Sequence, residues 1–379
     1  MHFDDAEETA ELRELAARLT WRGPSASETR FLSVFMDQNN KCNLRCKMCG
    51  FSDDRVAALP RYDMPRWLFD RIAAEVFPHA GYVCLSLMTE PFMTTDFPDR
   101  LRAVRDAGVP FSEVITNGTL LTAAACRKIV EAGLTRVIIS IDGGTKEVFE
   151  NIRTGASFER VLRNFELLRS TRASYGAAQP LLRVNHVLSE MNIDHFDAFL
   201  RLMERLAPDE VAVRTISRMS NAILQESQDA AFWAKVSAAR QALRALCVTT
   251  GIRDSAYLRR RHTLIDLFTD AGDKLLCPKP WTTVAIHPNG DVYPCMAWSR
   301  PPLGNLATAT LEEIWNGAAL AELRREFESA QAGVDCLNCS IRRGADDEDD
   351  DFFYRKLAKP APHPAPPRSA RASGSETHS

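Results

Sequence analysis

The chain has 379 residues, and its 47 Lys and Arg residues nearly balance its 50 Asp and Glu residues, giving a formal net charge of −3. This balance gives no reason to expect nucleic acid or an anionic membrane as a partner, and no run of about 18 apolar residues is present to span a bilayer. Residues 1–20 lack the basic start and apolar stretch of a secretory signal. We therefore expect a cytoplasmic protein whose ten cysteines are ligands or buried thiols rather than disulfides.

Residues 1–28 are predicted to form a polar helical arm, and residues 29–220 a barrel-like domain. In that domain, short apolar runs rich in β-branched residues alternate with segments of helical periodicity, which predicts βα units. The runs are almost continuously apolar, as in parallel strands that are buried on both faces. Strands are predicted over 31–36, 82–88, 112–116, 136–141, 181–188 and 210–216, with helices over 65–77, 97–108, 124–133, 158–169 and 194–206.

The rest of the chain divides into a connector, a second unit and a tail. Residues 221–270 are expected to form a helical connector. In the unit 271–344, the stretch TTVAIHPNGDVYPC predicts a β-hairpin that turns at Asn-Gly, and a helix is predicted over 311–327. The tail 345–379 is acidic and then rich in Pro, Ala and Ser. Such a composition buries too little apolar surface to fold, so we expect disorder.

Three cysteines, Cys42, Cys46 and Cys49, follow the first predicted strand in the stretch KCNLRCKMCGF. Thiolates at this spacing can wrap one 4Fe–4S cluster, and three protein ligands leave one iron open to another molecule. A structural zinc site needs four ligands, and a later C-x2-C pair leaves zinc open by count. A zinc ribbon, however, does not need a six-stranded scaffold with polar residues at successive strand ends.

The stretch CNLRCKMC matches the C-x3-C-x2-C motif, and the chain resembles the radical S-adenosylmethionine (SAM) superfamily over about residues 31–216. The resemblance implies an α/β fold, a partial (β/α)6 TIM-like barrel. It also implies that SAM binds the open iron and is cleaved to a 5′-deoxyadenosyl radical, which abstracts hydrogen from a substrate. An external one-electron reductant such as flavodoxin or ferredoxin is implied as a partner.

Two segments resemble the family's motifs after the second and third strands. LMTEP resembles the family's Gly-Gly-Glu-Pro stretch without its glycine pair, and implies that Glu90 takes the SAM amino group. TNGTLL resembles the turn after the third strand and implies a site role for Asn117, although capping the turn is the commoner role of such an asparagine.

Further segments supply the remaining expected SAM contacts. SIDGG implies Ser140 and Asp142 near the ribose and the methionyl group, and NIRTG implies Arg153 on the SAM carboxylate. A surface salt bridge is the alternative for Arg153. Met48 stands where the family usually has an aromatic residue by the adenine. All these residues follow strands, so they are expected at the C-terminal mouth of the barrel.

A second set of cysteines lies in the C-terminal unit: Cys277, Cys295, Cys336 and Cys339. Four thiolates can saturate a second 4Fe–4S cluster, and zinc is the alternative because C-x2-C suits a zinc knuckle equally well. The hairpin, followed by GNL and IWN, resembles the SPASM/twitch appendage of radical SAM enzymes, a β-hairpin plus helix. Because no cysteine follows Cys339, the resemblance implies the short form with one auxiliary 4Fe–4S cluster, for electron transfer or for structure.

The resemblance implies a radical SAM oxidoreductase. Single-cluster appendages are similar to those of enzymes that dehydrogenate or epimerise small polar metabolites, such as sugars and aminocyclitols, and the residues before Phe31 are too few for a leader-peptide domain. A peptide- or protein-modifying maturase and a non-catalytic, metal-stabilised binding protein are the alternatives. Strand parity alone leaves open whether Asn185, His186 and Arg214 contact a substrate or pack.

Overall fold

The computed structural model describes residues 30, 32–216, 229–254, 279–296, 298, 300–328 and 336. The predicted N-terminal arm and the predicted disordered tail lie outside these residues, as do two predicted auxiliary ligands, Cys277 and Cys339. Within the described part of the chain, no helix is both long and apolar enough to cross a membrane.

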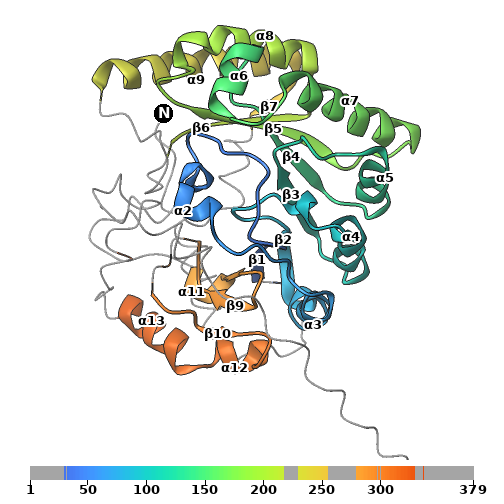
Figure 1. Cartoon of the computed structure of the whole chain (residues 1–379), viewed down its shortest axis with the longest axis vertical. Coiled ribbons are helices and arrows are strands. Elements are labelled where there is room, and N and C mark those ends of the chain that lie inside the picture. The colour runs from blue at the N-terminus through green and yellow to red at the C-terminus, as the bar shows by residue number, and fades with distance from the viewer. Residues whose placement is uncertain are drawn as a thin grey trace, which may run out of the picture.

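Six parallel strands confirm the predicted partial barrel. They are β1 (Leu32–Met36), β2 (Ala80–Cys84), β3 (Phe111–Thr116), β4 (Arg136–Ser140), β5 (Leu181–Leu188) and β6 (Glu210–Thr215). Helices cover the outer face of the curved sheet (Figure 1): α3 (Arg66–Val76), α4 (Phe97–Asp106), α5 (Ala123–Glu131), α7 (Phe158–Ser174) and α8 (Phe196–Leu206). The apolar runs and the helical periods thus form the elements predicted for them.

Several shorter elements lie between these strands and helices and after them. They are the helices α2 (Asp54–Ala57), α6 (Lys146–Ile152) and α11 (Lys279–Thr282), and 3-10 turns at Gly50–Ser52, Phe77–His79, Pro91–Met93 and Ile193–His195. In the predicted connector, α9 (Ala230–Thr250) leads to β7 (Arg253–Asp254), which pairs with β6. Figure 1 places α9 beside α8 at the β6–β7 end of the sheet.

Side chains alternate between the helix-covered face of the sheet and the barrel interior. On β4, Val137 and Ile139 belong to the main hydrophobic core under the helices. Arg136 points inward, where it pairs with Glu113 of β3 at 2.5 Å and with Glu210 of β6 at 2.9 Å. This buried network fills the interior near the N-terminal ends of the strands. A functional site is therefore expected at the C-terminal ends of the barrel strands.

Two elements differ from the prediction. The second strand was expected over 82–88 but ends at Cys84, because the Ser86 hydroxyl accepts the N–H of Ile115 at 2.7 Å and the following N–H groups bond to a side chain at the end of β1. The single helix predicted over 311–327 is two helices, α12 (Leu311–Trp315) and α13 (Ala318–Glu328). Asn316 and Gly317, both poor helix formers, separate them.

The C-terminal hairpin extends the barrel sheet. Strand β8 (Thr283–Ile286) pairs in parallel with β1 and antiparallel with β9 (Asp291–Tyr293), and β10 (Gly304–Asn305) follows. The order is β10-β9-β8-β1-β2-β3-β4-β5-β6-β7. The hairpin turns at Gly290, which has φ +90°, as the Asn-Gly signal predicts. Figure 1 shows α12 and α13 in orange at the end of the molecule near α3.

Candidate active site

The three cysteines after β1 lie together at the barrel mouth. Burial raises the pKa of all three thiols, that of Cys46 to about 12, and neighbouring thiols add to the rise at Cys42 and Cys46. Thiols of this kind stay protonated at neutral pH without a metal, so metal binding must release their protons. Cys42, Cys46 and Cys49 form the donor set that an iron–sulfur cluster requires.

One zinc ion fits this loop poorly. Thiolates around one zinc lie about 4 Å apart, because each Zn–S bond is about 2.3 Å long. No three His, Cys, Asp or Glu side chains in the described ranges are arranged to hold one metal ion. A cube of four irons and four sulfides is larger than one ion, and each of the three thiols can bind a different iron.

The cysteine loop pairs with the segment that carries Arg153. The N–H of Arg45 donates to the carbonyl of Thr154, and the N–H of Lys47 donates to the carbonyl of Ile152, both at 2.9 Å. These two backbone bonds flank Arg153 and fix its position relative to the cysteines. The juxtaposition expected from the motifs is therefore produced by main-chain pairing.

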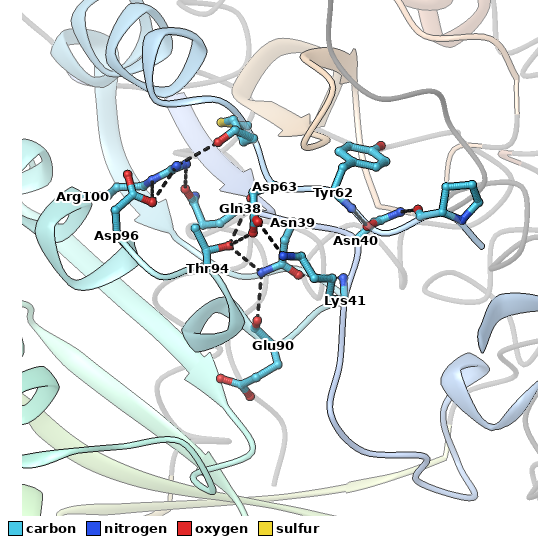
Figure 2. A network of polar contacts seen from close by, with 12 residues as sticks. Gln38, Asn39, Asn40, Lys41, Tyr62, Asp63, Glu90, Thr94, Asp96 and Arg100 are labelled. Carbon is cyan, nitrogen blue, oxygen red and sulfur yellow. Dashed lines mark hydrogen bonds and ion pairs between the residues drawn. The ribbon is translucent and has the colours of Figure 1, made fainter. Parts of the chain in front are cut away.

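A polar network, buried at Asn39 and Thr94, holds the chain between β1 and the first cysteine (Figure 2). Asn39 donates from Nδ2 to the carbonyl of Glu90 at 3.0 Å and to Oγ1 of Thr94 at 2.8 Å, while its Oδ1 accepts the N–H of Lys41 at 2.7 Å. Thr94 in turn donates to Asp63 Oδ1 at 2.6 Å, and Asp63 Oδ2 pairs with Lys41 Nζ at 2.5 Å. We call Asn39, Lys41, Asp63 and Thr94 the loop brace, since they tie the cysteine loop to the Glu90 turn.

Glu90 is buried between the cysteine loop and β3. Its Oε1 accepts from Thr116 Oγ1 at 2.8 Å and from the N–H of Phe92 at 3.2 Å, and its Oε2 accepts the N–H of Asn117 at 2.8 Å. Its own N–H donates to the carbonyl of Lys41 at 2.9 Å. Burial raises the pKa of Glu90 to about 7, against the lowering by these hydrogen bonds. Oε2 retains a lone pair that suits an ammonium group.

Asp37 organises the loop that stands in place of the family's glycine pair. Its buried carboxylate accepts the N–H groups of Leu87 at 2.8 Å, Met88 at 3.1 Å and Thr89 at 3.3 Å, and the hydroxyl of Thr89 at 2.8 Å. These bonds fix the three residues before Glu90. Asp37 was not predicted as a site residue, although it carries the same signal as the others, a polar side chain directly after an apolar strand.

Asn117, directly after β3, contacts the cysteine loop through its side-chain amide. Its Nδ2 donates to Asn43 Oδ1 at 2.8 Å and lies 3.9 Å from Cys42 Sγ. Its Oδ1 accepts the N–H of Thr119 at 2.9 Å and the hydroxyl of Thr119 at 2.6 Å. Asn43 also donates to Thr119 Oγ1 at 2.9 Å. The turn after β3 is thereby joined to the loop between the first two cysteines.

Asp142 and Arg153 form a buried ion pair beside Cys46. Arg153 Nε donates to Asp142 Oδ2 at 2.6 Å, and its Nη1 lies 3.9 Å from Cys46 Sγ. The other oxygen of Asp142 accepts the N–H of Val187 at 2.7 Å, and this side chain is 0% exposed. Arg153 is therefore not in a surface salt bridge. We expect Asp142 to position Arg153 rather than to contact SAM itself.

Ser140 and Met48 are both half-buried. Ser140 ends β4 opposite Asn185 of β5, and Met48 lies in the turn between the second and third cysteines. Their predicted places beside the ribose and the adenine stay predictions.

On β5, neighbouring side chains point either to the helix layer or into the barrel, and only the latter can contact a bound molecule. His186 lies in the helix layer, because its Nδ1 is 2.8 Å from the carbonyl oxygen of Ile141 and its ring packs on Phe196 and Phe199. The side chain of Asn185 points the other way, into the barrel. Within the described residues, the buried Oδ1 of Asn185 has no hydrogen-bond partner. Asn185 is thus the better candidate for contact with a bound molecule.

The described part of the C-terminal unit packs on the barrel. Cys295, after β9, and Cys336 are half-buried and contact the same hydrophobic core as the barrel residues. Arg71 of α3 donates to the carbonyls of Ala307 and Ala309, both at 3.1 Å. The assignment of Cys295 and Cys336, with Cys277 and Cys339, as auxiliary ligands stays a prediction.

Together, the strand order and the cysteine loop at the barrel mouth define a class. The chain belongs to the radical SAM superfamily and carries a C-terminal SPASM-type domain: the model of the radical SAM superfamily matches residues 39–203, and that of the SPASM iron–sulfur cluster-binding domain matches residues 277–340. The cofactors of this class are SAM and 4Fe–4S clusters, one of which binds SAM.

Relatives differ in what they act on. The chain is 26% identical over 192 residues to the tungsten-containing aldehyde ferredoxin oxidoreductase cofactor-modifying protein of Pyrococcus furiosus, covering 48% of this chain and 51% of that protein, so it spans about half the length of this relative. It is 28% identical over 271 residues to the mycofactocin maturase MftC of Mycobacterium ulcerans, covering 67% of each.

The fold is shared with SuiB of Streptococcus suis. The crystal structure of SuiB bound to its precursor peptide SuiA matches with a TM-score of 0.61 at 15% identity, covering 89% of this chain and 75% of that one. The structure of SuiB bound to S-adenosylmethionine matches with a TM-score of 0.60. At this identity the likeness concerns the fold alone.

Proposed function

We propose that this radical SAM enzyme modifies a peptide or protein side chain. The similarity to the maturase MftC carries the proposal, because it extends over two thirds of both chains and thus beyond the SAM-binding core. The proposal is also supported by SuiB, a protein of the same fold whose crystal structure contains a bound precursor peptide. The predicted oxidation of a small polar metabolite gains no comparable support and stays a prediction.

In the proposed site, residues of this chain hold and orient the cofactors. Cys42, Cys46 and Cys49 would ligate three irons, while Glu90 would accept the SAM ammonium and Arg153 the SAM carboxylate. When bound, the cluster and SAM would supply radical chemistry for the removal of a hydrogen atom from the substrate. The barrel mouth would hold the reacting side chain close to that radical, so orientation is the protein's main contribution.

The reductant and the class of net reaction belong to the proposal. We expect an external one-electron donor such as flavodoxin or ferredoxin, and a net oxidation or a crosslink of the peptide as the outcome. The four predicted auxiliary cysteines would hold the second cluster, for which electron transfer is the expected role.

The test uses anaerobically reconstituted protein and a triple variant with Cys42, Cys46 and Cys49 replaced by Ala. About eight irons per chain are expected in the wild type and about four in the variant, with 5′-deoxyadenosine formed after reduction by the wild type alone. Peptides encoded beside the gene and a panel of aminocyclitols and sugars are then offered as substrates. A mass change in a peptide that depends on the three cysteines is expected. Turnover of a sugar or cyclitol with every peptide unchanged would overturn the proposal.

A further inference from the structure

Asn117 uses every hydrogen-bonding position of its side-chain amide within the protein. An amide offers two N–H donors and an oxygen with two lone pairs. The oxygen accepts from the N–H and from the hydroxyl of Thr119, while the nitrogen faces Asn43 Oδ1 at 2.8 Å and Cys42 Sγ at 3.9 Å. Nothing is left over for a SAM hydroxyl or amine unless one of these bonds breaks.

The orientation of this amide follows from its neighbours. The Thr119 N–H can only donate, so the oxygen of Asn117 must face it, and the nitrogen must then face Asn43 and Cys42. Asn117 is 7% exposed, and its backbone N–H donates to Glu90 Oε2 at 2.8 Å. The contacts with Thr119, Asn43 and Glu90 therefore hold the Nδ2 donor of Asn117 towards the sulfur of Cys42.

We infer that Asn117 acts on the predicted SAM-binding cluster and not on SAM: its Nδ2 donates a hydrogen bond to the thiolate of Cys42 and sets the reduction potential of that cluster. Hydrogen bonds to cluster sulfurs stabilise the reduced, more negative state and so raise the potential. A donor fixed by the protein therefore makes the cluster easier to reduce. The inference is independent of whether the substrate is a peptide or a metabolite.

The other two cysteines receive different donors. The Sγ of Cys46 lies 3.9 Å from Nη1 of Arg153, a guanidinium that also forms an ion pair with Asp142. The Cys49 thiol is approached by the N–H groups of Gly50 and Phe51. Asn117 is thus a neutral side-chain donor whose loss can be tested without removing the predicted ligand of the SAM carboxylate.

The experiment measures the midpoint potential of the cluster by a redox titration followed by electron paramagnetic resonance. The signal is assigned by its loss in the variant with Cys42, Cys46 and Cys49 replaced by Ala. Asn117→Leu removes the donor with little change in volume. Asn117→Asp keeps the oxygen facing Thr119 but replaces the donor by a charged acceptor, and it serves if the leucine variant does not fold. Thr119→Val is the matched control, because it loosens the same turn and leaves the donor in place.

We expect a more negative midpoint potential in Asn117→Leu, a larger negative shift in Asn117→Asp, and the wild-type value in Thr119→Val. SAM affinity, measured by calorimetry on the oxidised holoenzyme, should change less than threefold in Asn117→Leu. An unchanged potential in both Asn117 variants would overturn the inference, as would an equal shift in Thr119→Val. A large loss of SAM affinity at unchanged potential would return Asn117 to the SAM-binding role.

Discussion

At the scale of single residues, the ion pair of Arg153 and Asp142 explains why an arginine is required at this place. Asp142 accepts a hydrogen bond from Nε of the guanidinium, at 2.6 Å, and the terminal nitrogen Nη1 lies 3.9 Å from Cys46 Sγ. A lysine carries its three donors on one nitrogen, so it cannot pair with Asp142 through one nitrogen and offer a planar, bidentate pair of nitrogens to a SAM carboxylate. The planar guanidinium of Arg153 can therefore pair with Asp142 and also bind the SAM carboxylate, as predicted.

We predict that Arg153→Lys lowers SAM affinity at least about tenfold, since the loss of a charge-assisted hydrogen bond costs about 1.5–3 kcal/mol. The measurement is a titration of SAM into reconstituted protein. Arg172→Lys is the matched control, because Arg172 also pairs with a carboxylate, that of Asp209 at 2.5 Å, but at the opposite end of the barrel. Equal SAM affinity in wild type and Arg153→Lys would contradict the assignment.

At the scale of elements, the loop brace explains how the segment after β1 places the first cysteine. Asn39 is 0% exposed and connects the cysteine loop with the turn that carries Glu90. Replacement by Ala leaves several buried polar groups without partners, at a cost of about 1–3 kcal/mol for each. This destabilisation affects the segment that carries Cys42 and would have to hold the cluster.

We predict that Asn39→Ala reconstitutes with less iron in the Cys42/Cys46/Cys49 site and forms less 5′-deoxyadenosine. Asn192→Ala controls for general destabilisation, because Asn192 is equally buried and bonds to the carbonyls of Val187 and Asp142, not to the cysteine loop or the Glu90 turn. The control should lower the midpoint of thermal unfolding and keep its iron. Similar iron loss in both variants would mean that the brace only stabilises the fold.

The same elements mark how far the sequence could predict the molecule. Periodicity was sufficient for the six strands, and the motifs were sufficient to bring together Glu90, Asn117, Asp142 and Arg153 around the cysteines. Residues such as Asp37 and Asn39 were missed because their partners lie about 50 residues further along the chain. Local pattern does not encode such pairs. The early end of β2 has the same cause, since the side chain of Asp37, directly after β1, accepts the N–H groups that would have continued the strand.

At the scale of the whole molecule, the C-terminal unit is part of the barrel sheet rather than a separate appendage. Strand β8 lies between β1 and β9, and the carbonyl of Ile286 accepts the N–H of Asp37 at 3.1 Å. Asp37 in turn holds the loop before Glu90. The hairpin is thereby connected to the predicted SAM site through two steps. The pairing joins residues about 250 apart in the chain, so neither motif predicted it.

We therefore predict that Ala285→Pro damages both cluster sites. Proline lacks the N–H and is not accommodated in a central strand, so this change should disrupt β8 and its pairing with β1. The iron content should fall well below about four atoms per chain, the content expected for an intact SAM-binding cluster. Thermal unfolding should be a single transition at a lower temperature than in the wild type. Ala318→Pro, at the first residue of α13, where proline is tolerated, is the control and should keep its iron. If Ala285→Pro kept SAM cleavage at the wild-type rate, the hairpin and the barrel would be energetically independent, and the path through Asp37 would carry no coupling between them.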